Sequence, residues 1–234
     1  MRRSLISVLF SLLAAVLPLP AAEPGAGTPQ PSFVPVADVP GLPRVLLVGD
    51  SISMGYTLKV RALLHGRANV HRPAANCGDT GRGLAQLDAW LGDGRWDVIH
   101  FNFGLHDLKY LDEAGKYVPP EQGKQVTPLG QYEANLRALV ARLRRTGARL
   151  VYATTTPVPD GTLGRVAGDE RRYNESARRV MQELDIPVDD LCALVTAQPE
   201  LQLPQNVHFT PAGYDALAAA VTTSLERQLP APAP

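Results

Sequence analysis

A three-layer α/β/α fold, in which a five-stranded parallel sheet lies between two layers of helices, is predicted by two features of the sequence. Short runs that are apolar throughout alternate with longer segments whose apolar residues recur at helical spacing. Strands without polar alternation are typical of a parallel sheet that is covered on both faces. We expect strands at 45–49, 69–71, 97–102, 149–153 and 186–188, and helices at 53–65, 83–91, 131–145, 170–184 and 212–229.

Each expected strand is short and apolar. The first reads Val-Leu-Leu-Val-Gly over 45–49, and those at 97–102 and 149–153 read Asp-Val-Ile-His-Phe-Asn and Arg-Leu-Val-Tyr-Ala. The segments 69–71 and 186–188 are brief and therefore weaker candidates. If one of them were a loop, the fold class would not change.

Helical periodicity is clearest over 131–145, where charged residues lie opposite an apolar stripe. The last helix is expected after Pro211. By contrast, the segment 109–129 shows no periodicity, and a loop of this length inside a compact domain is usually a binding loop or disordered. The apolar stripe of 131–145 consists of Leu136, Leu139, Val140 and Leu143.

The N-terminal sequence predicts export. Residues 1–22 begin with Met-Arg-Arg and continue with a short apolar run and small residues, which is typical of a secretory signal peptide. The run is shorter than the roughly 20 apolar residues that span a bilayer, so we expect a secreted or periplasmic protein without stable membrane insertion. An uncleaved short anchor is the alternative. A Pro-rich linker is expected over 23–43, the domain over 44–229 and a tail over 230–234.

Composition excludes several classes of protein. The 234 residues include 23 Lys and Arg and 23 Asp and Glu, so no net field attracts nucleic acid or an anionic membrane. A hydrophobic content of 45% suffices for the core of one domain. Cys77 and Cys192 are too few for a disulfide scaffold or a thiolate zinc site, and we expect both to be free.

Two polar residues stand where a parallel sheet places its ligands, beyond the carboxyl ends of the strands. Ser51 follows the first strand in Gly-Asp-Ser-Ile, at a helix start whose free backbone N–H groups favour an anion. His208 precedes the last helix in Asn-Val-His. Taken singly, Ser51 fits an ordinary helix N-cap and His208 an ordinary structural histidine.

Taken together and in order, four segments resemble the GDSL-type esterases, also called SGNH hydrolases. They are Gly-Asp-Ser-Ile at 49–52, Gly-Asp-Thr at 78–80, Gly-Leu-His-Asp at 104–107 and Asn-Val-His at 206–208. The resemblance runs from about 44 to 229 and implies a flavodoxin-like sheet and a carboxylic ester hydrolase. It further implies that Ser51 is the nucleophile, that His208 is the general base, and that the backbone N–H groups of Ser51 and Gly78 bind the oxyanion.

The chain departs from the family pattern at two positions. His106 stands where the family has an asparagine, so the side-chain oxyanion donor is either Asn102 or His106, unless two backbone donors suffice. Gln205 stands where the family has the aspartate of its triad, and glutamine supplies no charge. Asp189 or Asp190, at the end of the last strand, could supply the acid, as could a backbone carbonyl without any carboxylate.

Three other polar residues are expected to be structural. His100 lies inside an apolar strand and is most simply a hydrogen-bonded core residue. Asp107 and Asp50 are expected to accept hydrogen bonds from nearby backbone N–H groups instead of acting as catalytic acids.

The resemblance implies acyl transfer to Ser51 and no metal or organic cofactor. Export and a polar, tyrosine-containing loop favour a small acyl ester, and the family implies acetyl groups on carbohydrate or short-chain lipid esters. We expect a small-molecule or glycan ester, with acetyl esters first. The alternatives are a short-chain lipase or lysophospholipase-type esterase, and a catalytically inactive carbohydrate-binding domain. Nothing in the sequence indicates an oligomeric state.

Overall fold

The computed structural model describes residues 30–230. The expected signal peptide at 1–22, residues 23–29 of the expected linker and residues 231–234 of the expected tail lie outside the described residues. Within 30–230, no helix has the length and apolar content needed to cross a bilayer.

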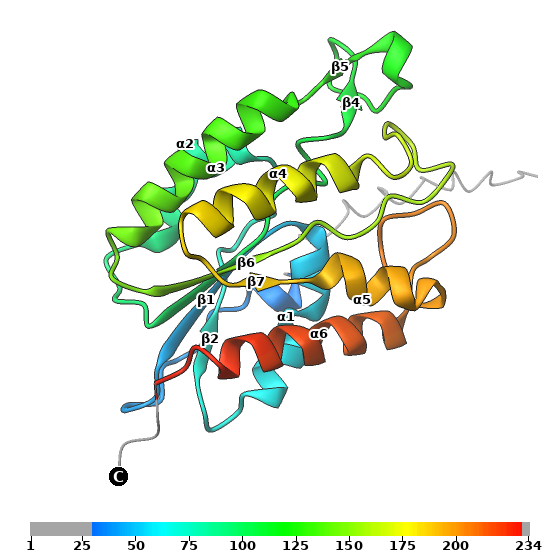
Figure 1. The fold of residues 1–234 in the computed structure, drawn as a ribbon. Helices are drawn as coiled ribbons and strands as arrows, with labels where there is room; N and C mark the ends of the chain where they lie inside the picture. The colour runs from blue at the N-terminus through cyan, green and yellow to red at the C-terminus, as the bar shows by residue number, and fades with distance from the viewer. Residues whose placement is uncertain (1–29, 231–234) are drawn as a thin grey trace, which may run out of the picture.

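A five-stranded parallel sheet forms the centre of the molecule (Figure 1). Its strand order is β2-β1-β3-β6-β7, and every neighbouring pair is parallel. Both short strands expected from the sequence are present, although the last one begins two residues later than expected. The strands are β1 (Arg44–Val48), β2 (Asn69–His71), β3 (Val98–Phe101), β6 (Arg149–Ala153) and β7 (Val188–Asp189).

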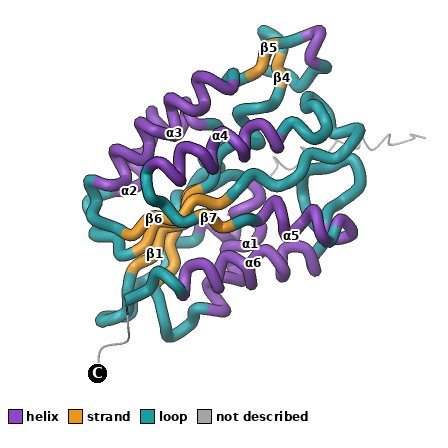
Figure 2. Tube along the Cα trace, in the orientation of Figure 1, coloured by secondary structure: helices purple, strands orange, loops and turns teal. Residues whose placement is uncertain are grey.

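Helices cover both faces of the sheet, so the predicted three-layer arrangement is confirmed (Figures 1 and 2). One layer contains α1 (Ser51–Leu63), α5 (Leu191–Ala197) and α6 (Pro211–Glu226). The other contains α2 (Thr80–Leu91), α3 (Leu129–Arg144) and α4 (Glu170–Glu183). No helix was expected at α5, because two turns are too short to show a helical period.

The core consists of the sheet and the inner stripes of the helices. Val45, Leu47 and Val98 are fully buried, which explains why these strands carry no polar alternation. The predicted apolar stripe of α3 is likewise at most 1% exposed at all four positions. Packing of this kind, and not a disulfide, holds the described part of the fold together, since Cys77 and Cys192 are both free as expected.

The described part of the expected linker packs against the domain. A short 3₁₀ helix, η1 (Pro31–Phe33), contacts α1, and the Phe33 ring lies 5.5 Å from the Arg72 guanidinium. The Asn69 amide exchanges hydrogen bonds with the backbone of Val39, at 2.9 and 3.1 Å. Part of the expected linker therefore makes specific contacts with α1 and β2.

The aperiodic segment 109–129 folds as a small excursion beyond the carboxyl edge of the sheet (Figure 1). It contains the antiparallel pair β4 (Tyr110–Leu111) and β5 (Lys124–Gln125), with η2 (Pro120–Gln122) before β5. Strands of two residues leave no alternation for a sequence pattern to show.

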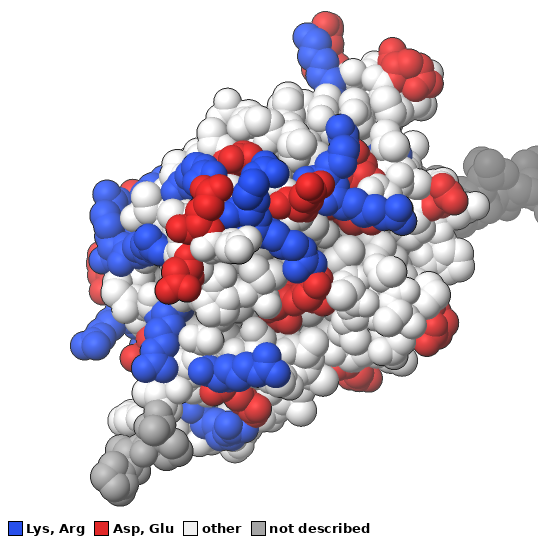
Figure 3. Space-filling model, in the orientation of Figure 1, with Lys and Arg blue, Asp and Glu red and all other residues white. Residues whose placement is uncertain are grey.

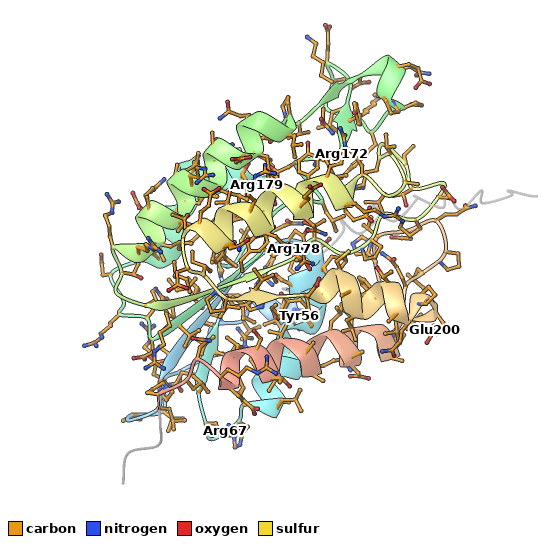
Figure 4. The ribbon with its side chains drawn as sticks, viewed as in Figure 1. Tyr56, Arg67, Arg172, Arg178, Arg179 and Glu200 are labelled. Atoms are coloured by element: carbon orange, nitrogen blue, oxygen red, sulfur yellow. The ribbon has the colours of Figure 1, made fainter. Side chains whose placement is uncertain are left out.

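Charges of both signs are interspersed over α3 and α4 (Figure 3). Glu133 on α3 pairs with Arg137 and with Arg179 of α4, and Arg179 is labelled in Figure 4. Hydrogen bonds from Arg179, Ser176 and Arg137 lower the pKa of Glu133 to about 2. On this face the acidic and basic side chains therefore pair with one another, and neither sign of charge predominates.

Candidate active site

Ser51 is the first residue of α1 and follows the turn that leaves β1. The Asp50 carboxylate caps the helix by accepting the Ile52 N–H at 2.9 Å, and Asp50 is 2% exposed. Its expected structural role is confirmed. A Cβ at Gly49 would lie 2.9 Å from the Ser53 side chain, so only glycine lets the strand pass this close to the helix.

The guanidinium of Arg72, on the loop after β2, holds this turn in place. Arg72 is 8% exposed, and burial lowers its pKa. Neutral oxygens satisfy its N–H groups, so the buried charge is solvated by protein dipoles. The turn that carries Ser51 is thereby tied to the loop that leads to Gly78. The five acceptors, at 3.0–3.2 Å, are Gly49 O, Ser53 Oγ, Thr57 Oγ1, Pro73 O and Ala75 O.

His208 reaches Ser51 from the loop between η3 (Pro199–Leu201) and α6. Its Nε2 lies 2.9 Å from Ser51 Oγ. The two residues are 157 positions apart in the chain, and the structure brings them together as the sequence pattern predicts. This distance suits transfer of the hydroxyl proton to the ring.

Asn206 orients the imidazole of His208. Its Oδ1 lies 3.0 Å from the backbone N of His208 and 2.8 Å from the ring Nδ1. A backbone N–H can only donate, so the Asn206 atom is the carbonyl oxygen, and the Nδ1 that approaches the same oxygen carries the proton. Nε2 is therefore unprotonated and accepts from the Ser51 hydroxyl. A general base requires this tautomer.

Asp189 and Asp190, the two carboxylates considered for the acid, form no hydrogen bond with His208 and have other partners. Asp189 accepts from His100 Nε2 at 3.0 Å inside the sheet, so His100 is the hydrogen-bonded core residue that the sequence predicts. Asp190 caps α5 and pairs with Arg178, which comes from α4 (Figure 4). Both carboxylates are thus engaged in joining β7 and α5 to neighbouring elements.

Gln205 lines the same cavity as His208, but no hydrogen bond joins the two side chains. Its φ is +54°, a backbone conformation that side chains other than glycine, asparagine and aspartate rarely adopt. The turn therefore directs Asn206, the next residue, toward the ring.

Gly78, the second backbone donor that the resemblance implies, is not among the cavity-lining residues, but its N–H is bonded to one of them. Its φ of +68° favours glycine, and its N–H donates to Asn76 Oδ1 at 3.1 Å. Asn76 lines the cavity together with Ser51. An ester oxyanion at the Gly78 N–H would replace Asn76 as the acceptor.

Asn102, one of two candidates for the side-chain oxyanion donor, faces the sheet. Its Nδ2 donates to Ala153 O at 2.8 Å, so its amide joins the ends of β3 and β6. Asn102 is 8% exposed and is not among the cavity-lining residues. Its amide is therefore already engaged with the backbone of β6.

His106, the other candidate, lines the cavity with Ser51 and His208. Lys109 Nζ lies 3.1 Å from its Nδ1. An ammonium group can only donate, so Nδ1 is the acceptor and the ring proton is on Nε2. Burial lowers the pKa of His106, and the charges of Lys109 and Arg165 act in the same direction, against the opposing carboxylates of Asp50 and Asp79. The ring is thus a neutral N–H donor.

Asp107 anchors the loop that carries His106. Its Oδ1 accepts the Thr80 N–H at 2.9 Å and the Thr80 hydroxyl, which confirms its expected structural role. Burial raises the pKa of Asp107 to about 7. This contact joins the start of α2 to the loop after β3, so the segments that carry Gly78 and His106 are held together.

The site opens into a cavity of about 430 Å³, a volume within the range of small-molecule sites. Its lining combines the predicted site residues with residues of two loops. No group of three His, Cys, Asp or Glu side chains within 30–230 is arranged to hold a metal ion. The lining residues are Ser51, Asn76, His106, Tyr117, Thr162, Leu163, Arg165, Gln205, Asn206, Val207 and His208.

Residues 47–216 match the GDSL-like lipase/acylhydrolase family. The chain belongs to this family. Membership agrees with the placement of Ser51 and His208 at facing positions and confirms the resemblance seen in the four sequence segments.

Solved structures share the fold of this GDSL-like chain. An acetyl xylan esterase is 15% identical with a TM-score of 0.64, and the match covers 78% of this chain and 99% of that one. A lipase/acylhydrolase from Enterococcus faecalis is 19% identical with a TM-score of 0.66, covering 82% and 100%. A variant of an acetyl-xylooligosaccharide esterase from Geobacillus is 19% identical with a TM-score of 0.62, covering 78% and 94%. No curated protein matches the sequence.

Three residues of this GDSL-like site were not predicted individually. Asn206 stands in the segment Asn-Val-His, and an asparagine two residues before a histidine is itself a signal for an Asx-type hydrogen bond. Lys109 and Arg165 lie in segments without periodicity, and nothing in their sequence surroundings marks them as neighbours of His106.

Proposed function

We propose that this protein is a serine esterase that hydrolyses small acyl esters, with acetyl esters of carbohydrate as the preferred class. The observation that carries the proposal is the 2.9 Å contact between Ser51 Oγ and His208 Nε2, with the ring in the accepting tautomer. A serine at a helix N-terminus beside such a ring has what nucleophilic acyl transfer requires.

The proposed reaction begins when Ser51 Oγ attacks the ester carbonyl and His208 Nε2 takes the hydroxyl proton. The resulting imidazolium keeps its Nδ1–H on the Asn206 carbonyl, which holds the ring but supplies no negative charge. His208 then gives the proton to the departing alcohol. Water, deprotonated by the same ring, hydrolyses the acyl-enzyme and regenerates Ser51.

Three donors are proposed for the tetrahedral oxyanion. Two are the backbone N–H groups of Ser51 and Gly78, and the third is the Nε2–H of His106 in place of the asparagine usual in the family. Lys109 acts through His106 because its contact with Nδ1 keeps the proton on Nε2. Donors held in place before the reaction stabilise the developing charge most effectively.

The preference for an acetyl ester rests on the site and on its relatives. A cavity of about 430 Å³ admits a short acyl chain and one or two sugar rings, and its lining is largely polar in residue type. Two of the structures with the same fold are esterases of acetylated xylan or xylooligosaccharide. A short-chain lipid ester is the second candidate, favoured by Leu163, which lines the cavity and is 66% exposed.

Hydrolysis of 4-nitrophenyl acetate by the purified protein tests the function, with Ser51→Ala as the paired variant. We expect turnover that the substitution abolishes; turnover that persists in Ser51→Ala, or no turnover in either protein, contradicts the proposal. Comparing acetylated xylooligosaccharide with 4-nitrophenyl octanoate then separates the carbohydrate from the lipid substrate.

Export is proposed from residues 1–22, whose basic start and short apolar run support a signal peptide. Expression of the full chain in a bacterium should give a protein in the periplasm or medium whose mass lacks these residues. Full-length protein that stays in the cytoplasm would contradict export.

A further inference from the structure

Arg165 brings a guanidinium to the cavity beside Ser51. It lies on the loop between β6 and α4, and its Nε donates to Leu105 O at 3.0 Å. That bond fixes the group against the residue that precedes His106. The Tyr117 phenol is a neutral hydrogen-bonding partner of the guanidinium, which leaves N–H donors of the Nη groups without an anionic acceptor among residues 30–230. Within 30–230, no Asp or Glu side chain forms an ion pair with Arg165.

The charges around the cavity are unbalanced. Among the described residues that line the cavity, only Arg165 has a formal charge at neutral pH. Lys109 contacts His106 from outside this lining, and the Asp50 carboxylate, one residue before Ser51, acts on both His106 and Arg165 without forming an ion pair with either. The Tyr117 ring lies between the two cations, 5.1 Å from Lys109 Nζ and 5.4 Å from Arg165 Cζ. Because the whole chain has a net charge of zero, this excess of positive charge belongs to the site and not to the protein.

A partly buried guanidinium without an anionic partner loses hydration that neutral acceptors replace only in part. Burial lowers the pKa of Arg165, and only the Tyr117 phenol and the more distant Asp50 oppose this effect. Protein cations in such places normally have an anionic partner, because the loss of hydration is otherwise uncompensated. The planar fork of a guanidinium matches the two oxygens of a carboxylate or phosphate group.

We propose that Arg165 forms an anion subsite and that the natural ester carries a carboxylate or phosphate group on its alcohol part. The acyl part of the proposed substrate is small and uncharged, so the anionic group must be on the alcohol part of the ester. This inference rests on the proposed esterase function and narrows its substrate to acylated acidic sugars or acylated phosphate esters. The anion would bind end-on to the Nη groups while the ester carbonyl lies against Ser51.

Matched esters test the subsite. The specificity constant kcat/KM is measured with the anionic ester 4-acetoxybenzoate and with its neutral methyl ester, and the ratio of the two is compared between the wild type and Arg165→Gln. We expect this ratio to fall by about 10-fold or more in the variant, the size of one charge-assisted hydrogen-bonded pair. Arg165→Lys keeps the charge but loses the planar pair of N–H donors, so its kcat/KM ratio should lie between those of the wild type and Arg165→Gln. The ester 4-acetoxyphenyl phosphate is measured in parallel. A larger loss of kcat/KM with this ester than with 4-acetoxybenzoate in Arg165→Gln would show that the subsite prefers phosphate to carboxylate.

The control variant is Arg171→Gln, which removes a guanidinium that is 83% exposed on α4 and does not line the cavity. It should keep the wild-type ratio. An equal fall in both arginine variants would show a general effect of charge and overturn the subsite, as would an unchanged ratio in Arg165→Gln.

A binding measurement separates this inference from the esterase proposal. Calorimetric titration with 4-acetoxybenzoate, carried out on Ser51→Ala and on Ser51→Ala/Arg165→Gln, does not need turnover. We expect the Kd to rise about 10-fold when Arg165 is replaced. If the wild type fails to hydrolyse any ester but this difference in Kd is present, the esterase proposal is wrong and the anion subsite stands. Equal Kd values in the two proteins would overturn the subsite.

Discussion

The Asn206 carbonyl accepts two hydrogen bonds from His208, one from the backbone N–H at 3.0 Å and one from the ring Nδ1 at 2.8 Å. A single oxygen thus fixes both the position of the histidine and the tautomer of its ring. Asparagine performs the orienting part of the role that aspartate plays in a complete triad, but not the electrostatic part. The site therefore separates these two contributions, and substitution at Asn206 can measure them.

Asn206→Ala should lower kcat by about 100-fold or more, because the ring loses the partner that keeps the proton on Nδ1. Asn206→Asp should restore a charge and raise kcat, and the acid limb of the pH–rate profile should move to higher pH because the imidazolium is stabilised. Steady-state kinetics on 4-nitrophenyl acetate between pH 5 and 9 checks both. Gln205→Asp is the control, since Gln205 makes no hydrogen bond to the ring. A larger effect at Gln205 than at Asn206 would contradict the assignment.

The oxyanion donor is tested by comparing His106 with Asn102. His106→Ala should lower kcat by about 100-fold, the usual effect of removing one donor, and should change KM little. Lys109→Met should give a smaller fall in kcat, because the donor is still present but its tautomer is no longer fixed. Asn102→Ala should act mainly on stability, through the lost bond to Ala153 O. A fall in kcat at Asn102 without a loss of stability would reverse the roles of these two side chains.

The buried guanidinium of Arg72 is expected to be essential for stability. Arg72→Met removes the donors for five oxygens around the nucleophile turn, and the free energy of unfolding should fall by about 3 kcal/mol. Urea unfolding measures the loss, and Arg171→Met, at an exposed position, is the control. If Arg72→Met lowers the free energy of unfolding no more than Arg171→Met does, water satisfies the five oxygens in place of the guanidinium.

The sheet could be predicted from the sequence, but the details of the site could not. Apolar runs such as 45–49 predict buried parallel strands because burial on both faces leaves no polar alternation. Ser51 and His208 could be found because each stands next to an element boundary in a recognisable segment. The choice between Asn102 and His106 depends on whether an amide is already bonded to Ala153 O, and no sequence pattern shows that. The same holds for Asp189, whose partner His100 lies two strands away in the sheet.

Asp107 predicts how stability depends on pH. Burial raises its pKa to about 7 in the folded protein, against the usual value of 3.8 for an unfolded chain. Its Oδ2 is buried and has no hydrogen-bond partner among the described residues, which also favours the neutral acid. Between these two pKa values the folded state holds a proton that the unfolded state has lost, so this group lowers stability as the pH rises from about 4 to about 7. Above pH 7 the contribution of Asp107 is constant.

Asp107→Asn should remove that dependence while keeping an Oδ1 acceptor for the Thr80 N–H. The free energy of unfolding, measured in urea at pH 5 and at pH 8, should decrease less between the two values in the variant than in the wild type. Asp93→Asn, which removes the charge of an exposed carboxylate, is the control for a general effect of lost charge. If Asp107→Asn and the wild type lose the same free energy between pH 5 and 8, Asp107 is already ionised in the folded protein at pH 5. The buried carboxylate would then be stabilised by its bonds to Thr80 more strongly than burial opposes its charge.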